Sequence, residues 1–317
     1  MKTIVTIGTG YSGSSAVYEF LRLTNNFYDP FPNIEFSLTY DPGGVMDIDE
    51  CINKNFSPNK TTLIYEQFKK NIAFYTSKDY GLKQGKNMSI YNHSITNLLN
   101  EYLESLVEIK YEGQSLYLKY NNNLFLNFLS KLKIKFNKKI PKEIFLFCEN
   151  ENFQKITKIF FEKLFNINNH KKKNILLDQG GSIWNPYNST KYYNEPRCIL
   201  IFRDPRDIFS EFKSKSVYSY PGKDIKIFCD WYKKIMSNIN SKEIERSNIL
   251  KINFEDFINK NKDTIHLISE HIQTEIKTNN INYDFSRSIS NIQRYKKNLS
   301  EKEIQTIENN LKKYLYI

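Results

Sequence analysis

The N-terminal part of the chain passes from a short apolar run through glycines into an amphipathic segment. Residues 3–7 consist of Ile, Val and Thr, and residues 8–13 contain three glycines. Residues 14–23 then place their apolar side chains at helical spacing. A strand, a glycine turn and a helix in this order are typical of the start of an α/β domain.

Three later apolar runs have the character of buried parallel strands. They are residues 174–177, 198–202 and 248–252, each compact and largely aliphatic. Between the last two runs, residues 207–239 follow a helical pattern, as expected when parallel strands are joined by crossover helices. The sequence therefore predicts an α/β fold with a parallel sheet covered by helices.

The middle of the chain has a different character. From about 58 to 173 the pattern is helical, rich in Lys and Asn, with amphipathic stretches at 90–107, 124–132 and 153–165. No internal repeat and no low-complexity linker separates this stretch from the rest. We predict a single domain, 1–317, with a helical insertion at about 58–173.

Composition limits the class of protein and its partners. With 317 residues, 40% of them hydrophobic and 15% aromatic, the chain can build a sizeable core and is not intrinsically disordered. The formal net charge of +11 favours anionic partners. The basic residues are spread along predicted helices, so we expect no nucleic-acid binding, while peripheral contact with a membrane stays open.

The cysteines and the N-terminus indicate the cellular compartment of the protein. The four cysteines lie far apart, form no CxxC pair and have no clustered histidines beside them, so neither a metal site nor a disulfide framework is expected. The first apolar run is too short for a signal peptide, and no stretch approaches the about 18 apolar residues of a membrane-spanning helix. We therefore expect a cytoplasmic protein.

The run GTGYSGSS at residues 8–15 has the glycine spacing of a phosphate-binding loop. In such a loop, inward backbone N–H groups and the N-terminus of the following helix hold an anion. Ser14 stands where nucleotide triphosphatases carry a Lys that neutralises the terminal phosphates, which argues against ATP or GTP hydrolysis. The alternative is a plain tight turn, and the glycine spacing alone does not decide between the two.

A second polar motif, RDPRD, begins at Arg203 directly after the predicted strand 198–202. Arg203 and Arg206 therefore follow the carboxyl end of a strand, where α/β proteins bind ligands. Asp204 and Pro205 are suited to begin the next helix. The alternative is that the arginines pair with the neighbouring aspartates on the surface, an interaction of about 0–1 kcal/mol.

Together these motifs resemble those of the sulfotransferases that use 3′-phosphoadenosine 5′-phosphosulfate (PAPS). The SGSS core at 12–15 is similar to the loop of the carbohydrate branch, and Arg203 with Ser210 resembles the second motif. Residues 249–257 resemble the family's strand followed by an aromatic-Glu-Asp motif, and residues 294–300 resemble its C-terminal basic-aromatic segment. The resemblance covers both ends of the chain and leaves out the predicted insertion.

The resemblance implies a P-loop-kinase-like parallel β-sheet flanked by helices. It also implies transfer of a sulfuryl group from PAPS, a co-substrate, to a hydroxyl of a glycan or other small acceptor, without a metal. The glycine loop is then expected to bind the 5′-phosphosulfate, and an Arg and a Ser the 3′-phosphate. The residues expected to bind the co-substrate are Gly10, Tyr11, Ser12, Gly13, Ser14, Ser15, Arg203, Ser210, Arg294 and Lys296.

Two positions depart from the family pattern. Tyr11 stands before the Ser-Gly pair, where the family usually has a Lys or Arg that stabilises the bridging oxygen as sulfuryl leaves. Tyr11 donates a neutral hydrogen bond, or a basic residue from elsewhere supplies the charge, or catalysis is weak. Ser210 lies seven positions after Arg203 instead of eight, which rotates its hydroxyl by about 100° on a helix.

Transfer to a hydroxyl is assisted by a base that removes the proton. Glu35, which precedes the DPGG turn at 41–44, is the first candidate, and Asp178, at the end of the predicted strand 174–177, is the second. Either carboxylate can instead be a cap or turn acceptor. With Tyr11 they form the predicted catalytic set. Alternative functions are a P-loop kinase-like enzyme and a catalytically silent nucleotide-binding module.

Overall fold

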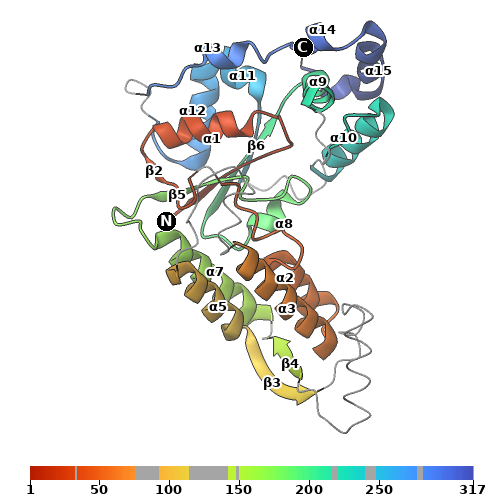
Figure 1. The fold of residues 1–317 in the computed structure, drawn as a ribbon. Coiled ribbons are helices and arrows are strands. Elements are labelled where there is room, and N and C mark those ends of the chain that lie inside the picture. Colours follow the sequence, from red (N-terminus) through yellow and green to blue (C-terminus); the bar gives the residue numbers. More distant parts are fainter. Residues whose placement is uncertain are drawn as a thin grey trace. The chain divides into compact units, whose positions relative to one another are not determined.

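The computed structural model of the chain describes residues 1–32, 34–75, 93–113, 142–147, 150–215, 220–239, 248–276 and 281–316. The chain divides into two compact units (Figure 1). The first comprises Met1–Ser37 and Phe165–Ile317, and the second comprises Leu38–Leu164. The second unit begins before the predicted insertion and ends within it. The organisation as one domain with an insertion stays a prediction.

The first unit is built on a five-stranded sheet in the order β2-β5-β1-β6-β7. All of its strand pairs are parallel, and the central strand β1 is buried almost throughout. The strands are β1 (Thr3–Gly8), β2 (Phe27–Tyr28), β5 (Asn174–Asp178), β6 (Pro196–Phe202) and β7 (Ile249–Asn253). Each apolar run found in the sequence forms a strand, and the predicted α/β class is confirmed. The two-residue β2 has no signal in the sequence.

One face of this sheet is covered by α1 (Ser14–Leu23), α11 (Phe254–Asn259) and α12 (Asn261–Ile272). Val17 of α1 and Phe257 of α11 share a buried cluster with Ile4 of β1. These side chains recur at helical spacing on the helices and at alternate positions on the strands, so one apolar face of each element meets the others.

The opposite face lies against α8 (Pro186–Thr190) and the residues around it. The Cys198 thiol of β6 donates to Thr190 Oγ1 (3.3 Å), and the Tyr193 hydroxyl donates to the Gly180 carbonyl (2.6 Å). Beyond the carboxyl end of β6, four helices form a second apolar cluster. They are α9 (Pro205–Lys215), α10 (Ile225–Ile239), α14 (Tyr295–Asn298) and α15 (Glu301–Leu311). The short α13 (Ser286–Ile289) precedes α14, and a 3₁₀ turn, Lys312–Tyr314, follows α15.

The described residues of the second unit form helices and an antiparallel pair of strands. Its core contains Phe68 and Tyr102, and the Tyr102 ring stacks on Phe160 with centroids 4.1 Å apart. The helices are α2 (Val45–Lys54), α3 (Pro58–Tyr75), α5 (His93–Ser105) and α7 (Asn150–Asn166), and the strands are β3 (Val107–Gly113) and β4 (Lys142–Phe147).

The predicted helical insertion at about 58–173 also contains the strand pair β3 and β4. The stretches predicted as helices at 90–107 and 153–165 largely coincide with α5 and α7, while 124–132 lies outside the described residues. In β3, Val107, Ile109 and Tyr111 alternate with charged side chains, a period of two that is typical of a strand. The alternating pattern of a strand was therefore present in the sequence, although the high content of Lys and Glu obscured it.

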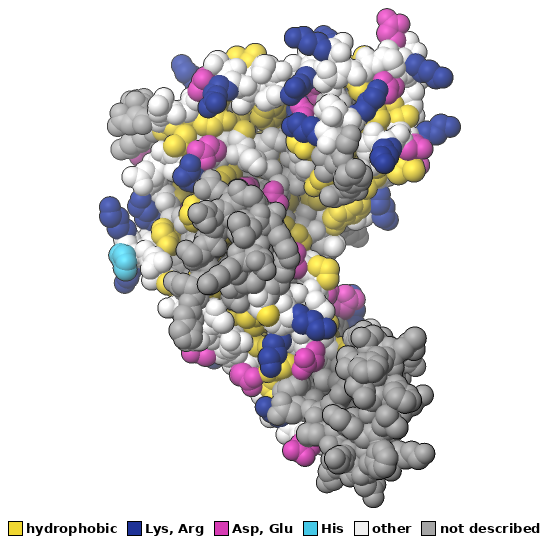
Figure 2. All heavy atoms as spheres, in the orientation of Figure 1, with side chains coloured by type: hydrophobic (Ala, Val, Ile, Leu, Met, Phe, Trp, Pro, Cys, Tyr) yellow, Lys and Arg dark blue, Asp and Glu magenta, His cyan; other side chains and the backbone are white. Residues whose placement is uncertain are grey.

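Two surface features follow from the described residues. None of their helices is both long and apolar enough to cross a membrane. On the face drawn in Figure 2, Lys and Arg side chains are scattered among Asp and Glu and do not gather in one patch.

Candidate functional site

The glycine loop joins β1 to α1 at the carboxyl edge of the sheet. Gly13 caps α1 in the left-handed conformation, with φ +89°, and Tyr11 also has a positive φ, +62°. A Cβ added to Gly13 would lie 2.2 Å from the Phe254 ring. The backbone path thus requires a glycine at position 13, both for its φ and for the space beside it.

Gln179 connects the two ends of this loop. It follows β5, which is the neighbour of β1 in the sheet. Its side-chain oxygen accepts from the Gly8 N–H (3.1 Å), and its Nε2 donates to Ser14 Oγ (2.8 Å). Gln179 thus holds the end of β1 against the start of α1. Its place directly after the strand Asn174–Asp178 could have marked Gln179 as a site candidate, as it did for Asp178.

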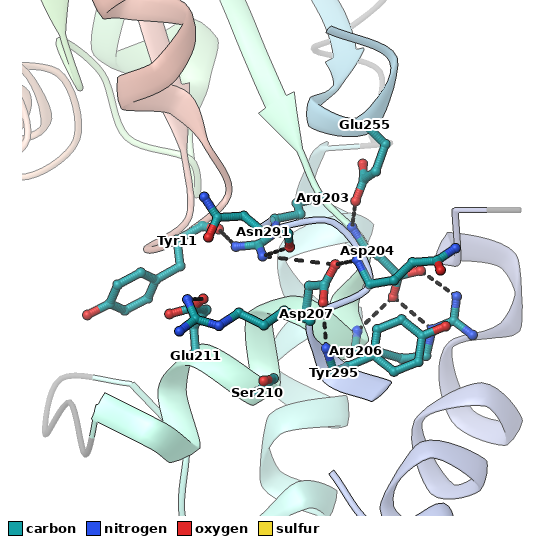
Figure 3. A network of polar contacts seen from close by, with 12 residues as sticks. Tyr11, Arg203, Asp204, Arg206, Asp207, Ser210, Glu211, Glu255, Asn291 and Tyr295 are labelled. Carbon is teal, nitrogen blue, oxygen red and sulfur yellow. Dashed lines mark hydrogen bonds and ion pairs between the residues drawn. The ribbon is translucent and has the colours of Figure 1, made fainter. Parts of the chain in front are cut away.

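Arg203 is buried, with 5% of its surface exposed, and its guanidinium connects three segments (Figure 3). Nη1 donates to the Tyr11 carbonyl at 2.9 Å, and Nη2 donates to the Asn291 carbonyl at 2.5 Å. Nη2 also lies 3.9 Å from Asp207 Oδ2 on α9. Arg203 therefore fixes the glycine loop and the segment before α14 against the start of α9.

Arg206 has a different environment from Arg203. Its Nη2 lies 2.6 Å from Asp204 Oδ2, and its Nη1 lies 2.6 Å from Glu308 Oε1 of α15. The guanidinium also lies 4.3 Å from the centre of the Tyr295 ring. These contacts join the start of α9 to the C-terminal helices, which makes Arg206 a structural residue.

Glu255 gives the aromatic-Glu-Asp motif a local role. It is 1% exposed, and its Oε1 accepts from the Asp204 N–H at 2.8 Å. Burial raises the pKa of Glu255 to about 7, and the hydrogen bond from the Asp204 backbone opposes that rise. The motif therefore orders the turn that presents Arg203.

A pocket of about 550 Å³ opens beside the glycine loop, and all of its lining residues belong to the first unit. It brings together several residues predicted from the sequence: Gly10, Tyr11, Gly13, Ser14, Ser15, Glu35 and Arg203. Sequence reasoning missed its other members, which are Thr9, Ala16, Gln179, Glu211, Lys215, Tyr220, Phe254, Ser288 and Asn291.

Three predicted residues are buried and do not line the pocket. Ser12 is one of them. Ser210 is fully buried, and its Oγ accepts from Asn298 Nδ2 at 3.0 Å. Asp178 is buried at the end of β5 and accepts from Thr6 Oγ1 at 3.4 Å, whereas Glu35, which bridges to it through the backbone, has its side chain exposed in the pocket.

The two predicted basic residues of the C-terminal segment also lie outside the pocket lining. Arg294 Nη1 lies 3.0 Å from Glu211 Oε1, so Arg294 acts on the pocket through a lining residue. Lys296 is exposed and donates to Gln293 Oε1 at 2.7 Å. Neither position is tested as a ligand contact by these distances, and both stay predictions.

The pocket contains opposite charges close together. Glu211 is 3% exposed, and its Oε2 lies 2.9 Å from Lys215 Nζ. Burial alone raises the pKa of Glu211, but the hydrogen bond from Lys215 and the charge of Arg294 outweigh it and hold the pKa below its usual value. Glu211 is therefore a carboxylate near neutral pH.

The charged face of α9 had a signal in the sequence. Asp207, Glu211 and Lys215 follow Arg203 at intervals of four residues, which places them on one side of a helix. On this face two carboxylates lie between two cations, and both cations, Arg203 and Lys215, contact Tyr11 of the glycine loop. The sequence alone did not show which partner the face would meet.

Some buried polar side-chain atoms lie near the loop. Within the described part of the chain, the buried atoms Thr9 Oγ1, Ser12 Oγ and Arg203 Nε have no hydrogen-bond partner. Buried polar atoms in native proteins are normally paired. Thr9 and Arg203 line the pocket, so the arrangement fits an anionic ligand that accepts hydrogen bonds there.

The described residues contain no group of three or more His, Cys, Asp or Glu side chains arranged to hold a metal ion. The charged residues of the pocket are instead two cations, Arg203 and Lys215, and two carboxylates, Glu35 and Glu211.

No protein-family model matches the sequence, and no curated protein matches it. Among solved structures, the chain is similar to the sulfotransferase domain of the olefin synthase from Synechococcus PCC 7002, at 9% sequence identity and a TM-score of 0.47, covering 98% of this chain and 94% of that chain. It is also similar to the sulfotransferase STF1 from Mycobacterium tuberculosis H37Rv, at 10% identity and a TM-score of 0.40, covering 97% and 76%. Both scores are low, so the function proposed for this chain depends on its own residues.

Proposed function

We propose that the chain is a sulfotransferase that moves a sulfuryl group from PAPS to a hydroxyl of a glycan or other small acceptor. The observation that carries the proposal is the meeting of the glycine loop, Arg203 and Glu35 in one pocket. Each of the three comes from a different part of the sequence, and each has a separate task in the reaction.

The glycine loop provides the binding site for the 5′-phosphosulfate. The N-terminus of α1 begins at Ser14, and the helix dipole there favours an anion. Gly13 allows the backbone to approach the ligand closely. Arg203 lines the pocket and supports this loop by donating to the Tyr11 carbonyl.

Glu35 is the candidate base for the acceptor hydroxyl. Its carboxylate is exposed in the same pocket as the loop, whereas Asp178, the second candidate, is buried and hydrogen-bonded to Thr6. A general base must reach the proton that it removes, so the geometry favours Glu35. The carboxylate takes the acceptor proton as the acceptor oxygen attacks sulfur.

The main alternative is a P-loop kinase-like enzyme acting on ATP. Such an enzyme needs a Lys at the position of Ser14 to neutralise the terminal phosphates. Here Ser14 is uncharged, and its hydroxyl accepts a hydrogen bond from Gln179 Nε2. A catalytically silent nucleotide-binding module is the second alternative, because Tyr11 stands where the family carries a cation.

Calorimetric titration of the purified chain separates these functions. We expect adenosine 3′,5′-bisphosphate, the product of PAPS, to bind and to raise the melting temperature, with ATP and GTP binding more weakly. Incubation with PAPS and a panel of hydroxyl acceptors, followed by mass spectrometry, then detects the added sulfuryl group. Preferential binding of ATP contradicts the proposal, and tight binding of the bisphosphate without consumption of PAPS supports the silent module.

A further inference from the structure

We propose that Lys215 is the catalytic cation of this site and replaces the charge that Tyr11 lacks. The proposal rests on the sulfotransferase function proposed above. In the donor complex, the Lys215 ammonium stabilises the negative charge that develops on the oxygen between phosphorus and sulfur. The cation thus comes from the end of α9 instead of the glycine loop.

The position of Lys215 relative to the loop is the first support. Lys215 lines the pocket, and its Nζ lies 4.2 Å from the centre of the Tyr11 ring. Tyr11 occupies the position directly before Ser12 and Gly13. The ammonium therefore stands over the residue at which the resemblance places a Lys or Arg. The Tyr11 ring also packs edge-on against Phe212 of α9, the helix that carries Lys215, with ring centroids 6.0 Å apart.

The other cations near the pocket are either buried or do not line it. Arg203 donates to the carbonyls of Tyr11 and Asn291, and it is buried beneath the loop. Arg294 pairs with Glu211 and does not line the pocket. Among the described lining residues, Lys215 alone combines a positive charge with a half-exposed side chain, at 47%. Its flexible four-carbon stem allows the ammonium to follow a moving charge.

Glu211 positions Lys215 without fixing it permanently. Glu211 holds Lys215 through Oε2 and Arg294 through Oε1. A buried carboxylate is costly to leave without a partner. Because Arg294 remains on the other oxygen, Lys215 can turn from Glu211 toward the donor while the carboxylate keeps one cation. Glu211 is therefore a positioning residue, and Lys215 is the group that touches the donor.

The step is an in-line displacement at sulfur. The acceptor oxygen forms a bond to sulfur, and the bond between sulfur and the bridging oxygen breaks. The electron pair of that bond stays on the bridging oxygen, which becomes a terminal oxygen of the 5′-phosphate of adenosine 3′,5′-bisphosphate. The acceptor proton passes to Glu35, or to solvent when water is the acceptor. Charge on the bridging oxygen increases only as this bond breaks, so Lys215 acts on the rate and little on ground-state binding.

The first experiment measures single-turnover conversion of PAPS to adenosine 3′,5′-bisphosphate, with water or an identified acceptor. We expect Lys215→Met to lower the rate about 100-fold, the usual cost of losing one group that stabilises transition-state charge. Lys215→Arg should restore part of the rate. Affinity for adenosine 3′,5′-bisphosphate, measured by calorimetry, should change by no more than about threefold.

Lys213→Met is the matched control. Lys213 lies on the same helix, pairs with one carboxylate (Glu303 Oε1, 2.7 Å) and has nearly the same exposure, 45%, but it does not line the pocket. We expect this variant to keep the parent rate. Melting temperatures of all variants should agree with the parent, because both side chains are half-exposed.

A second measurement needs no turnover. Orthovanadate with adenosine 3′,5′-bisphosphate imitates the trigonal transferring group, so its binding reports the transition state. Lys215→Met should weaken vanadate binding to the nucleotide complex at least about tenfold, while Lys213→Met leaves it unchanged.

Each outcome has one meaning. A Lys215→Met rate and vanadate affinity equal to those of the parent overturn the role of Lys215, and so does an equal loss in both lysine variants. Loss of bisphosphate binding together with rate shows that Lys215 only holds the nucleotide. If the parent binds no adenosine 3′,5′-bisphosphate and releases no product from PAPS, the proposed sulfotransferase function fails, and the role of Lys215 fails with it.

Discussion

The Arg203 guanidinium donates a hydrogen bond from Nη1 to the main-chain carbonyl of Tyr11, at 2.9 Å. This bond links the RDPRD motif directly to the backbone of the glycine loop. In the proposed complex with PAPS, phosphate recognition at the two motifs is coupled, because the arginine expected at the 3′-phosphate also supports the loop expected at the 5′-phosphosulfate. A substitution at position 203 therefore affects both ends of the nucleotide.

Arg203→Ala should weaken binding of adenosine 3′,5′-bisphosphate by about 2 kcal/mol or more, since a charge-assisted donor is lost. Binding of adenosine 5′-phosphate should weaken less, through the loosened loop alone. Calorimetry with both ligands measures the difference. Equal losses for the two nucleotides would show that Arg203 supports the loop and does not read the 3′-phosphate.

Glu211→Gln tests whether the ion pairs of the pocket affect nucleotide affinity and the single-turnover rate in different directions. The substitution keeps the size of the side chain and removes the negative charge between Lys215 and Arg294. We expect adenosine 3′,5′-bisphosphate to bind up to about threefold more tightly, because the pocket gains net positive charge. The single-turnover rate should fall, because Lys215 loses its positioning partner. A purely structural role of Glu211 predicts that binding and rate weaken together.

Glu35→Gln tests the proposed base. Turnover with a hydroxyl acceptor should fall by about 100-fold or more, in the range of general base catalysis, while affinity for adenosine 3′,5′-bisphosphate changes little. Asp178→Asn is the comparison, since that carboxylate does not line the pocket. If Asp178→Asn removes activity at unchanged stability and Glu35→Gln does not, the two assignments must be exchanged.

Glu255 makes stability depend on pH. Its pKa is about 7 in the folded protein, raised by burial from an ordinary value of 4.5. The folded state therefore holds a proton that the unfolded chain has released, so the free energy of unfolding should fall as pH rises from 4.5 to 7. The loss is on the order of 3 kcal/mol, at about 1.4 kcal/mol per pKa unit.

Glu255→Gln should remove this part of the pH dependence. The amide oxygen can still accept from the Asp204 N–H, and the amide carries no titrating proton. Urea unfolding of parent and variant at pH 5 and pH 8 makes the comparison, because all other groups titrate in both proteins. If the free energy of unfolding changes with pH equally in parent and variant, the proton that the folded state holds is not on Glu255.

The sequence contained enough to predict the sheet, because strands buried on both faces have continuous apolar runs such as residues 198–202. It also contained the glycine loop and the RDPRD motif, because each is a run of consecutive residues that can be recognised from its residue types alone. The short β2 was not predictable, since it pairs with β5 through the backbone of two residues. Ser210 is buried and hydrogen-bonded to Asn298, so its expected contact with the 3′-phosphate stays a prediction.

The pairing of Lys215 with Tyr11 was not readable from the chain. The spacing of Glu211 and Lys215 on α9 defines a face, but only the folded sheet brings that face to the loop. Gln179 shows the same limit, because its contacts with Gly8 and Ser14 depend on β5 lying beside β1. Contacts between segments that are distant in the sequence depend on how the strands and helices are arranged, so they cannot be read from the local sequence around each residue.

Tyr11 and Lys215 together allow a test by exchange of charge. In the parent, Tyr11→Lys brings a second ammonium close to Lys215, so repulsion should lower the single-turnover rate. In the Lys215→Met background, the same Tyr11→Lys substitution restores a cation beside the bridging oxygen and should recover most of the rate. Tyr11→Phe removes only the hydroxyl and should leave the rate near that of the parent, because the charge comes from Lys215. Single-turnover rates of the four variants decide the matter: if Tyr11→Lys raises the rate equally with and without Lys215, the two side chains do not share one position in the transition state.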